Sequence, residues 1–145
     1  MRQATFNKNW DKLLNYAKGS LLSVYTQDLS HKWAEAQFEL RTRSIVIDTS
    51  YPPKALIANF LHELGHFHDD HKVSNTEWNL VNTAYHNFNT GRRMTAKQKN
   101  RVLQTEIKAW EDGRFIAKLL NIRLGQWYTD YRNLAIFDLK RRLGI

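Results

Sequence analysis

Residues 52–66 read PPKALIANFLHELGH, and this stretch decides how the chain is expected to fold. The proline pair fixes φ at the start of a helix, and the run 54–61 that follows is apolar around almost the whole helix circumference. A helix that is apolar on every side is buried inside its protein. The sequence therefore predicts a buried helix that ends in two histidines and one glutamate.

These polar residues at the helix end have the spacing of a metal site. His62 and His66 are four residues apart, so they project from one helical face about 40° apart and can bind the same ion. Two neutral imidazoles suit Zn²⁺, and Glu63 beside them lies where a metal-activated water needs a general base. The alternative interpretation of the same residues is an ordinary buried polar cluster or a solvated helix end.

A catalytic zinc site has three protein ligands, so a third one must come from elsewhere in the chain. Glu106 is the favoured candidate because it lies in an apolar stripe of the helix predicted near residues 96–121, where a lone carboxylate is costly unless it is paired or coordinating. Glu111, about 140° further around that helix, is expected to face solvent. The rivals are His86, on a separate predicted helix, and His71, which reaches the metal only if the first helix unwinds before it.

The HELGH motif followed by the ExxA sequence of residues 106–109 resembles the gluzincins, such as the ImmA/IrrE-like and related small zinc peptidases of bacteria and phages. The match covers residues 45–120. The resemblance implies a zincin-like minimal metalloprotease domain with Zn²⁺ as cofactor and a peptide or protein as substrate. It also implies His62, His66 and Glu106 as metal ligands and Glu63 as the catalytic general base and acid.

The chain departs from this family pattern at Trp110, where several gluzincins have an acid or amide that steadies a ligand histidine. Asp112 or a backbone carbonyl is the expected replacement. Tyr128, Tyr131 and His86 are candidate donors to the oxyanion formed during hydrolysis. A SprT-like protease, with a histidine as third ligand, is a second interpretation of the motif.

The chain as a whole suits a single domain over residues 1–145. It contains no cysteine, which excludes disulfides, thiol catalysis and thiolate metal ligands. It has neither a signal-like N-terminal segment nor an apolar run of membrane-spanning length. We therefore expect a cytoplasmic protein without a membrane association, and the resemblance implies that the cell is a bacterium or a phage-infected host.

The net charge of +8 is concentrated in the C-terminal part of the chain. Residues 89–145 hold 13 Lys or Arg and 5 Asp or Glu, whereas residues 1–88 hold 9 of each. This excess of positive charge suits nucleic acid or an acidic protein, but a solvated basic surface has the same composition. An alternative function is therefore a basic nucleic-acid- or protein-binding module with a structural or vestigial zinc site.

The pattern of apolar residues predicts an α+β fold with a small N-terminal antiparallel sheet and a mostly helical C-terminal half. Residues 37–48 form one long strand or two strands with a bend near Ser44. As the resemblance implies, this segment is either an edge strand that aligns an extended peptide substrate or an inner strand of the sheet. The other elements are expected at helix 7–18, strand 21–25, the helix of the HELGH motif, and helices near 75–90, 96–121 and 126–143.

Overall fold

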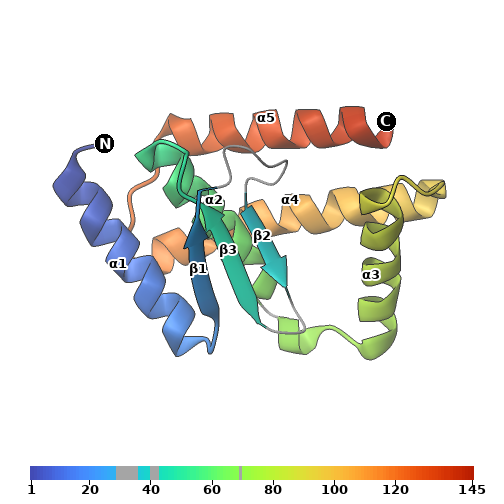
Figure 1. Ribbon diagram of the computed structural model, residues 1–145, viewed down its shortest axis with the longest axis horizontal. Coiled ribbons are helices and arrows are strands. Elements are labelled where there is room, and N and C mark those ends of the chain that lie inside the picture. Colours follow the sequence, from blue (N-terminus) through green and yellow to red (C-terminus); the bar gives the residue numbers. More distant parts are fainter. Residues whose placement is uncertain (29–35, 40–42, 69) are drawn as a thin grey trace.

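The computed structural model has eight main elements and one short 3₁₀ helix, and it describes residues 1–28, 36–39, 43–68 and 70–145 (Figure 1). The side chains of residues 36–39 and of His71 are outside this description. In chain order the elements are α1 (Gln3–Gly19), β1 (Ser23–Gln27), β2 (Ala36–Glu39), β3 (Ser44–Asp48), α2 (Pro53–Phe67), η1 (Asp70–Lys72), α3 (Asn75–Asn89), α4 (Ala96–Leu119) and α5 (Gln126–Leu143). The fold is α+β and mostly helical, as the sequence predicts.

The three strands form one mixed sheet in the order β1-β3-β2. β2 pairs antiparallel with β3, from Ala36 opposite Ile47 to Glu39 opposite Ser44. β1 pairs with β3 in parallel, so the prediction of an antiparallel sheet is wrong for this pair. Parallel strands need a connection of about a dozen residues or more, and the segment that contains β2 provides it. The alternation of apolar residues along a strand does not reveal this, because it is the same for either direction.

The segment 37–48 contains two strands rather than one. Arg43, directly before β3, has a φ of 50°, which places the bend next to Ser44 as predicted. β3 is the central strand and β2 is an edge strand, so the segment contributes one inner strand and one edge strand to the sheet. Alignment of a peptide substrate along β2 stays a prediction. Ile45 and Ile47 of β3 are fully buried against the helices.

The buried helix predicted from residues 52–66 is α2, which lies between the sheet and α4 (Figure 1). Its residues Ile57, Ala58, Phe60 and Leu61 are fully buried. They belong to the main core cluster, which also takes in residues from α1, β3, α4 and α5. A second, smaller cluster joins α3, α4 and the end of α5 through Ala84, Val102, Leu103, Leu139 and Leu143.

Helices α2 and α4 cross with their backbones in contact. A Cβ atom added to Gly65 would lie 1.9 Å from the carbonyl oxygen of Ala109, and one added to Gly113 would lie 2.6 Å from that of Leu61. Both distances are far shorter than any non-bonded contact allows. The two glycines therefore permit this close crossing, which determines how near Glu106 of α4 comes to the histidines of α2.

We expect Gly65→Ala to lower the free energy of unfolding by about 3 kcal/mol, because the added methyl group forces two packed helices apart. Chemical denaturation monitored by circular dichroism measures this loss. Gly19→Ala is the matched control, because Gly19 is also helical and a Cβ there meets nothing within 4 Å. Equal stability of both variants would show that the helices separate at little cost.

The predicted starts of α3 and α4 are confirmed by their caps. Thr95 and Gln98 form a complete capping box at α4. The Thr95 hydroxyl accepts a hydrogen bond from the backbone N–H of Gln98, and the Gln98 side-chain oxygen accepts one from the backbone N–H of Thr95. At α3, the Ser74 hydroxyl accepts from the Glu77 amide. In the part of the chain that the structure describes, no helix has the length and apolar character needed to span a bilayer.

Candidate metal centre

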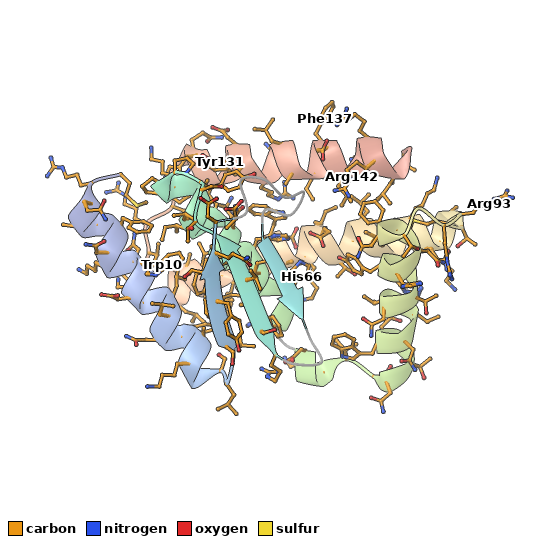
Figure 2. The ribbon with its side chains drawn as sticks, viewed as in Figure 1. Trp10, His66, Arg93, Tyr131, Phe137 and Arg142 are labelled. Atoms are coloured by element: carbon orange, nitrogen blue, oxygen red, sulfur yellow. The ribbon has the colours of Figure 1, made fainter. Side chains whose placement is uncertain are left out.

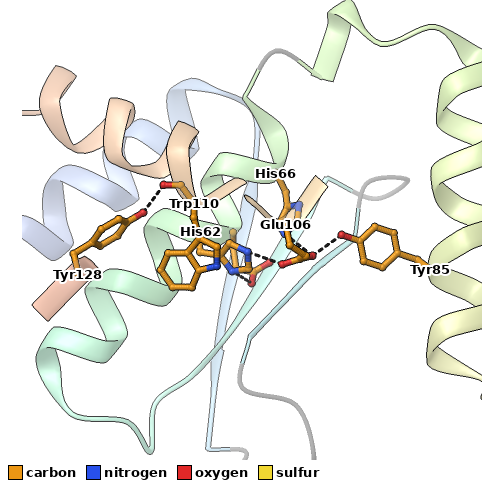
Figure 3. A network of polar contacts seen from close by, with 7 residues as sticks. His62, His66, Tyr85, Glu106, Trp110 and Tyr128 are labelled. Carbon is orange, nitrogen blue, oxygen red and sulfur yellow. Dashed lines mark hydrogen bonds and ion pairs between the residues drawn. The ribbon is translucent and has the colours of Figure 1, made fainter. Parts of the chain in front are cut away.

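The structure brings His62, His66 and Glu106 together at the crossing of α2 and α4 (Figure 3). The Nε2 atom of His62 lies 2.8 Å from Oε2 of Glu106, and Nε2 of His66 lies 3.3 Å from Oε1 of the same carboxylate. One donor atom from each of the three residues lies within 4.8 Å of the others. These are the three residues that the sequence singled out as metal ligands.

Two properties of this group fit a zinc ion. Zinc bonds of about 2.1 Å in tetrahedral geometry put the ligand atoms about 3.4 Å apart. The His66–Glu106 distance of 3.3 Å is close to this value, and the His62–Glu106 distance of 2.8 Å is shorter, as in a direct hydrogen bond. Two imidazoles and one carboxylate are also a donor set that zinc accepts. The side chains of His66, His62 and Glu106 are 3%, 14% and 18% exposed, so the donors are shielded but not sealed from solvent.

Glu63 contributes a second observation. Its side chain is buried, and its Oε1 atom lies 3.3 Å from Nδ1 of His62. Its Oε2 atom is buried with no hydrogen-bond partner among the described residues. A buried carboxylate oxygen without a partner is costly, which indicates that a water or another polar group belongs beside it.

The histidines and the carboxylates of this group each shift the other's pKa toward the charged form. Burial alone lowers the pKa of His62, but the carboxylates of Glu106 and Glu63 outweigh burial and raise this pKa to about 10. Burial alone raises the pKa of Glu106, but the neighbouring His66 and His62 hold it well below its ordinary value. A protonated His62 thus balances the negative charge of the two carboxylates. A metal cation would supply the same positive charge, because metal binding releases the protons of its ligands.

Trp110 supports the first histidine. Its ring stacks on that of His62, with 4.5 Å between centroids and 11° between planes. The backbone carbonyl of Trp110 accepts a 2.8 Å hydrogen bond from the buried Tyr128 hydroxyl, which joins α5 to α4 at this point. The Trp110 ring thus restricts the orientation of the His62 imidazole by stacking.

Tyr85 of α3 is the member of the site that the sequence analysis missed. Its hydroxyl donates a 2.5 Å hydrogen bond to Oε1 of Glu106. Burial and the nearby Glu106 carboxylate raise the pKa of Tyr85 well above its ordinary value, so the hydroxyl keeps its proton. One signal in the sequence could have identified it. Tyr85 lies on the apolar face of α3, beside Ala84 and Phe88, and a tyrosine hydroxyl that is buried needs a hydrogen-bond partner.

The other candidate residues lie elsewhere. His86 is exposed near the end of α3 and does not join the group, and Glu111 is exposed as predicted. His71 lies in η1, beyond the end of α2, and its side chain is outside the described residues. Asp112 forms an ion pair with Lys108 rather than supporting a histidine.

The candidate oxyanion donors are likewise not at the group. Tyr128 is fully buried and its hydroxyl is used by Trp110. Tyr131 packs half-buried against the main core cluster. The structure thus gives both tyrosines a place in the packing of α5.

Comparisons of this chain with protein-family models, with curated proteins and with solved structures find no match. The site is therefore interpreted from its own geometry and chemistry.

We expect Tyr85→Phe to weaken zinc binding by about 10- to 100-fold, because groups that hydrogen-bond to a ligand carboxylate orient it and set its basicity. Competition with a zinc-specific chelator measures the affinity. Tyr131→Phe, which removes a hydroxyl from the packing of α5, is the control and should bind zinc normally. Unchanged affinity in Tyr85→Phe would show that its hydrogen bond to Glu106 has no part in metal binding.

Proposed function

We propose that this protein is a zinc-dependent peptidase in which Glu63 acts as general base and then as general acid. The observation that carries the proposal is the convergence of His62, His66 and Glu106 beside a buried carboxylate oxygen of Glu63 that has no partner among the described residues. The resemblance of HELGH and the downstream ExxA to the gluzincins supports a zincin-like domain of this type. The close crossing of two helices at glycines supports a rigid ligand set.

In this proposal each residue has a separate task. His62 and His66 offer Nε2 atoms and Glu106 offers a carboxylate oxygen, with Trp110 and Tyr85 holding two of these ligands in place. A bound Zn²⁺ supplies a Lewis acid that lowers the pKa of a water to about 7 and polarises the peptide carbonyl. Glu63 is adjacent to the ligands yet is not one of them, so its carboxylate stays available for proton transfer.

Proton transfer through Glu63 completes the reaction. The carboxylate accepts a proton from the water as the oxygen forms its bond to the peptide carbonyl carbon. The same proton then passes to the peptide nitrogen as the C–N bond breaks, which gives a carboxylic acid and an amine. One acid–base group thus serves both steps and returns to its starting state.

The number of ligands supports an enzyme over a structural zinc site. Structural zinc sites use four protein ligands, whereas catalytic sites use three and leave one position for water or substrate. Within the described ranges, no fourth histidine or acid joins the three residues at the crossing. The proposed substrate is a peptide segment in extended conformation, which can add to the edge strand β2, in contact with α2.

The first test is the metal itself. Elemental analysis of the purified full chain is expected to find about one zinc per molecule, and anomalous diffraction at the zinc edge should place it among His62, His66 and Glu106. Protein that contains no zinc and takes up none on incubation would refute the proposal. Zinc bound by four protein side chains would instead identify a structural site.

A further inference from the structure

A second candidate site lies at the opposite end of α4 from its crossing with α2. A hollow of about 690 Å³ is lined by Phe88, Gly91, Arg92, Arg93, Met94, Lys99, Arg142 and Leu143. The end of α3, the following loop, the start of α4 and the end of α5 meet there, and Figure 2 labels Arg93 and Arg142 at this end of the molecule. None of the proposed zinc ligands lines the hollow.

The hollow carries four positive charges and no negative one. Arg92, Arg93, Lys99 and Arg142 form no ion pair with any described acidic residue, unlike Arg101 with Glu77 and Arg141 with Asp138. Four cations around one hollow repel each other, and an anion bound between them would offset this repulsion. Their arrangement therefore favours a negatively charged ligand.

Two of these cations are held by the fold. The guanidinium of Arg142 lies over the ring of Phe88, 4.6 Å from its centroid. Lys99 is half-buried, and its Nζ atom lies beside Gly144 after the end of α5, 3.8 Å from the point where a Cβ atom on that glycine would be. Arg92 and Arg93 lie in the connection between α3 and α4 and are exposed, as is Arg142. Three exposed cations and the half-buried Lys99 thus line the hollow together with Phe88, Met94 and Leu143.

The positive surface extends beyond the hollow. Residues 90–99 contain four Lys or Arg and no acid, and residues 138–145 contain three and a single acid, Asp138. Of the members that do not line the hollow, Lys97 and Lys140 are exposed and form no ion pair with a described acidic residue, whereas Arg141 is paired with Asp138. A small anion would leave these outer charges unused, whereas a chain with a charge on every unit reaches them as well.

We propose that this end of the molecule binds the phosphate backbone of a nucleic-acid strand. Phosphates repeat along the strand whatever its sequence, and the planar fork of arginine matches a phosphate in two hydrogen bonds. Met94 and the uncovered part of Phe88, both partly exposed, provide an apolar contact for a sugar or a base, whereas Leu143 is buried beneath them. An acidic peptide would need a run of carboxylates to match the same surface.

The test compares two double variants that each lose two exposed positive charges. Arg92→Gln/Arg93→Gln changes the hollow, and Lys118→Gln/Arg123→Gln changes the other end of α4 and the loop after it. Fluorescence anisotropy of a labelled mixed-sequence oligonucleotide, single-stranded and as a duplex, gives the affinity of the purified full chain from about 50 mM salt upward. All four cations are at exposed positions, so both variants should fold.

We expect Arg92→Gln/Arg93→Gln to bind the oligonucleotide about tenfold more weakly than wild type. The slope of log affinity against log salt concentration should become less steep by about 2, because two phosphate contacts are lost. The control variant should change the affinity less than about twofold. An equal loss in both variants would attribute the binding to net charge alone and overturn the assignment to the hollow. Absence of binding at low salt, or displacement of the oligonucleotide by polyglutamate of equal charge at equal concentration, would overturn the proposal. None of these results depends on peptide cleavage, so the outcome is separate from that of the proposed peptidase.

Discussion

Glu63→Gln is expected to reduce peptide cleavage by about 1,000-fold while the protein keeps its full complement of zinc. Glutamine has nearly the same size as glutamate, so the buried site should retain its packing. The amide cannot accept the proton of the attacking water, which removes the general base. His62, His66 and Glu106 are unchanged, so metal binding should persist.

Turnover is measured with a peptide that the wild-type protein cleaves, identified from a peptide library by mass spectrometry. Glu111→Gln is the matched control, because Glu111 is exposed on α4 and its replacement should leave the cleavage rate unchanged. Cleavage at the wild-type rate in Glu63→Gln would reject the assigned role.

Glu106→Ala is expected to weaken zinc binding by about 100-fold or more. Four-ligand zinc sites bind with about 10–16 kcal/mol, or about 3 kcal/mol per ligand, and each 1.4 kcal/mol is a factor of ten. The substitution also removes the hydrogen bond between the Tyr85 hydroxyl and Glu106, together with the negative charge that faces both histidines. Cleavage should be lost together with the metal.

Chelator competition and elemental analysis measure this effect, and Glu111→Ala is the control on the same helix. Excess zinc should restore part of the activity of Glu106→Ala if Glu106 acts only by holding the metal. An unchanged zinc affinity would show that another residue is the third ligand, and His71 would then be the first to replace. The two variants test different things. Glu106→Ala changes the zinc affinity, whereas Glu63→Gln changes the cleavage rate at an unchanged zinc content.

The helices could be predicted from sequence because their signals are local. Prolines, capping residues and apolar stripes define α2, α3, α4 and α5 within a few residues of the observed bounds. The inward position of Glu106 also followed from its place in the stripe of α4. Strand pairing could not be predicted in the same way, because the partner and direction of β1 depend on residues that lie far along the chain.

The supporting residues of the site were harder to predict. Trp110 appeared in the sequence as a departure from a family pattern, yet its ring stacks on His62. Tyr85 was not singled out in the sequence at all, yet it donates to Glu106 across 21 positions in sequence. Both roles depend on how two helices pack, and the spacing of residues along one helix carries no information about the distance to another.

The sequence by itself thus determined the helix that carries His62, Glu63 and His66, and it marked Glu106 as a carboxylate that needs a partner. Both conclusions come from helix periodicity and from the cost of burying charge, which act within a few turns of one helix. Only the tertiary structure decided that Tyr85 holds Glu106, that β1 runs parallel to β3, and that separate basic segments surround one hollow. These features arise where distant segments come into contact, and that contact is set by the packing of the whole core, including the glycine crossing of α2 and α4.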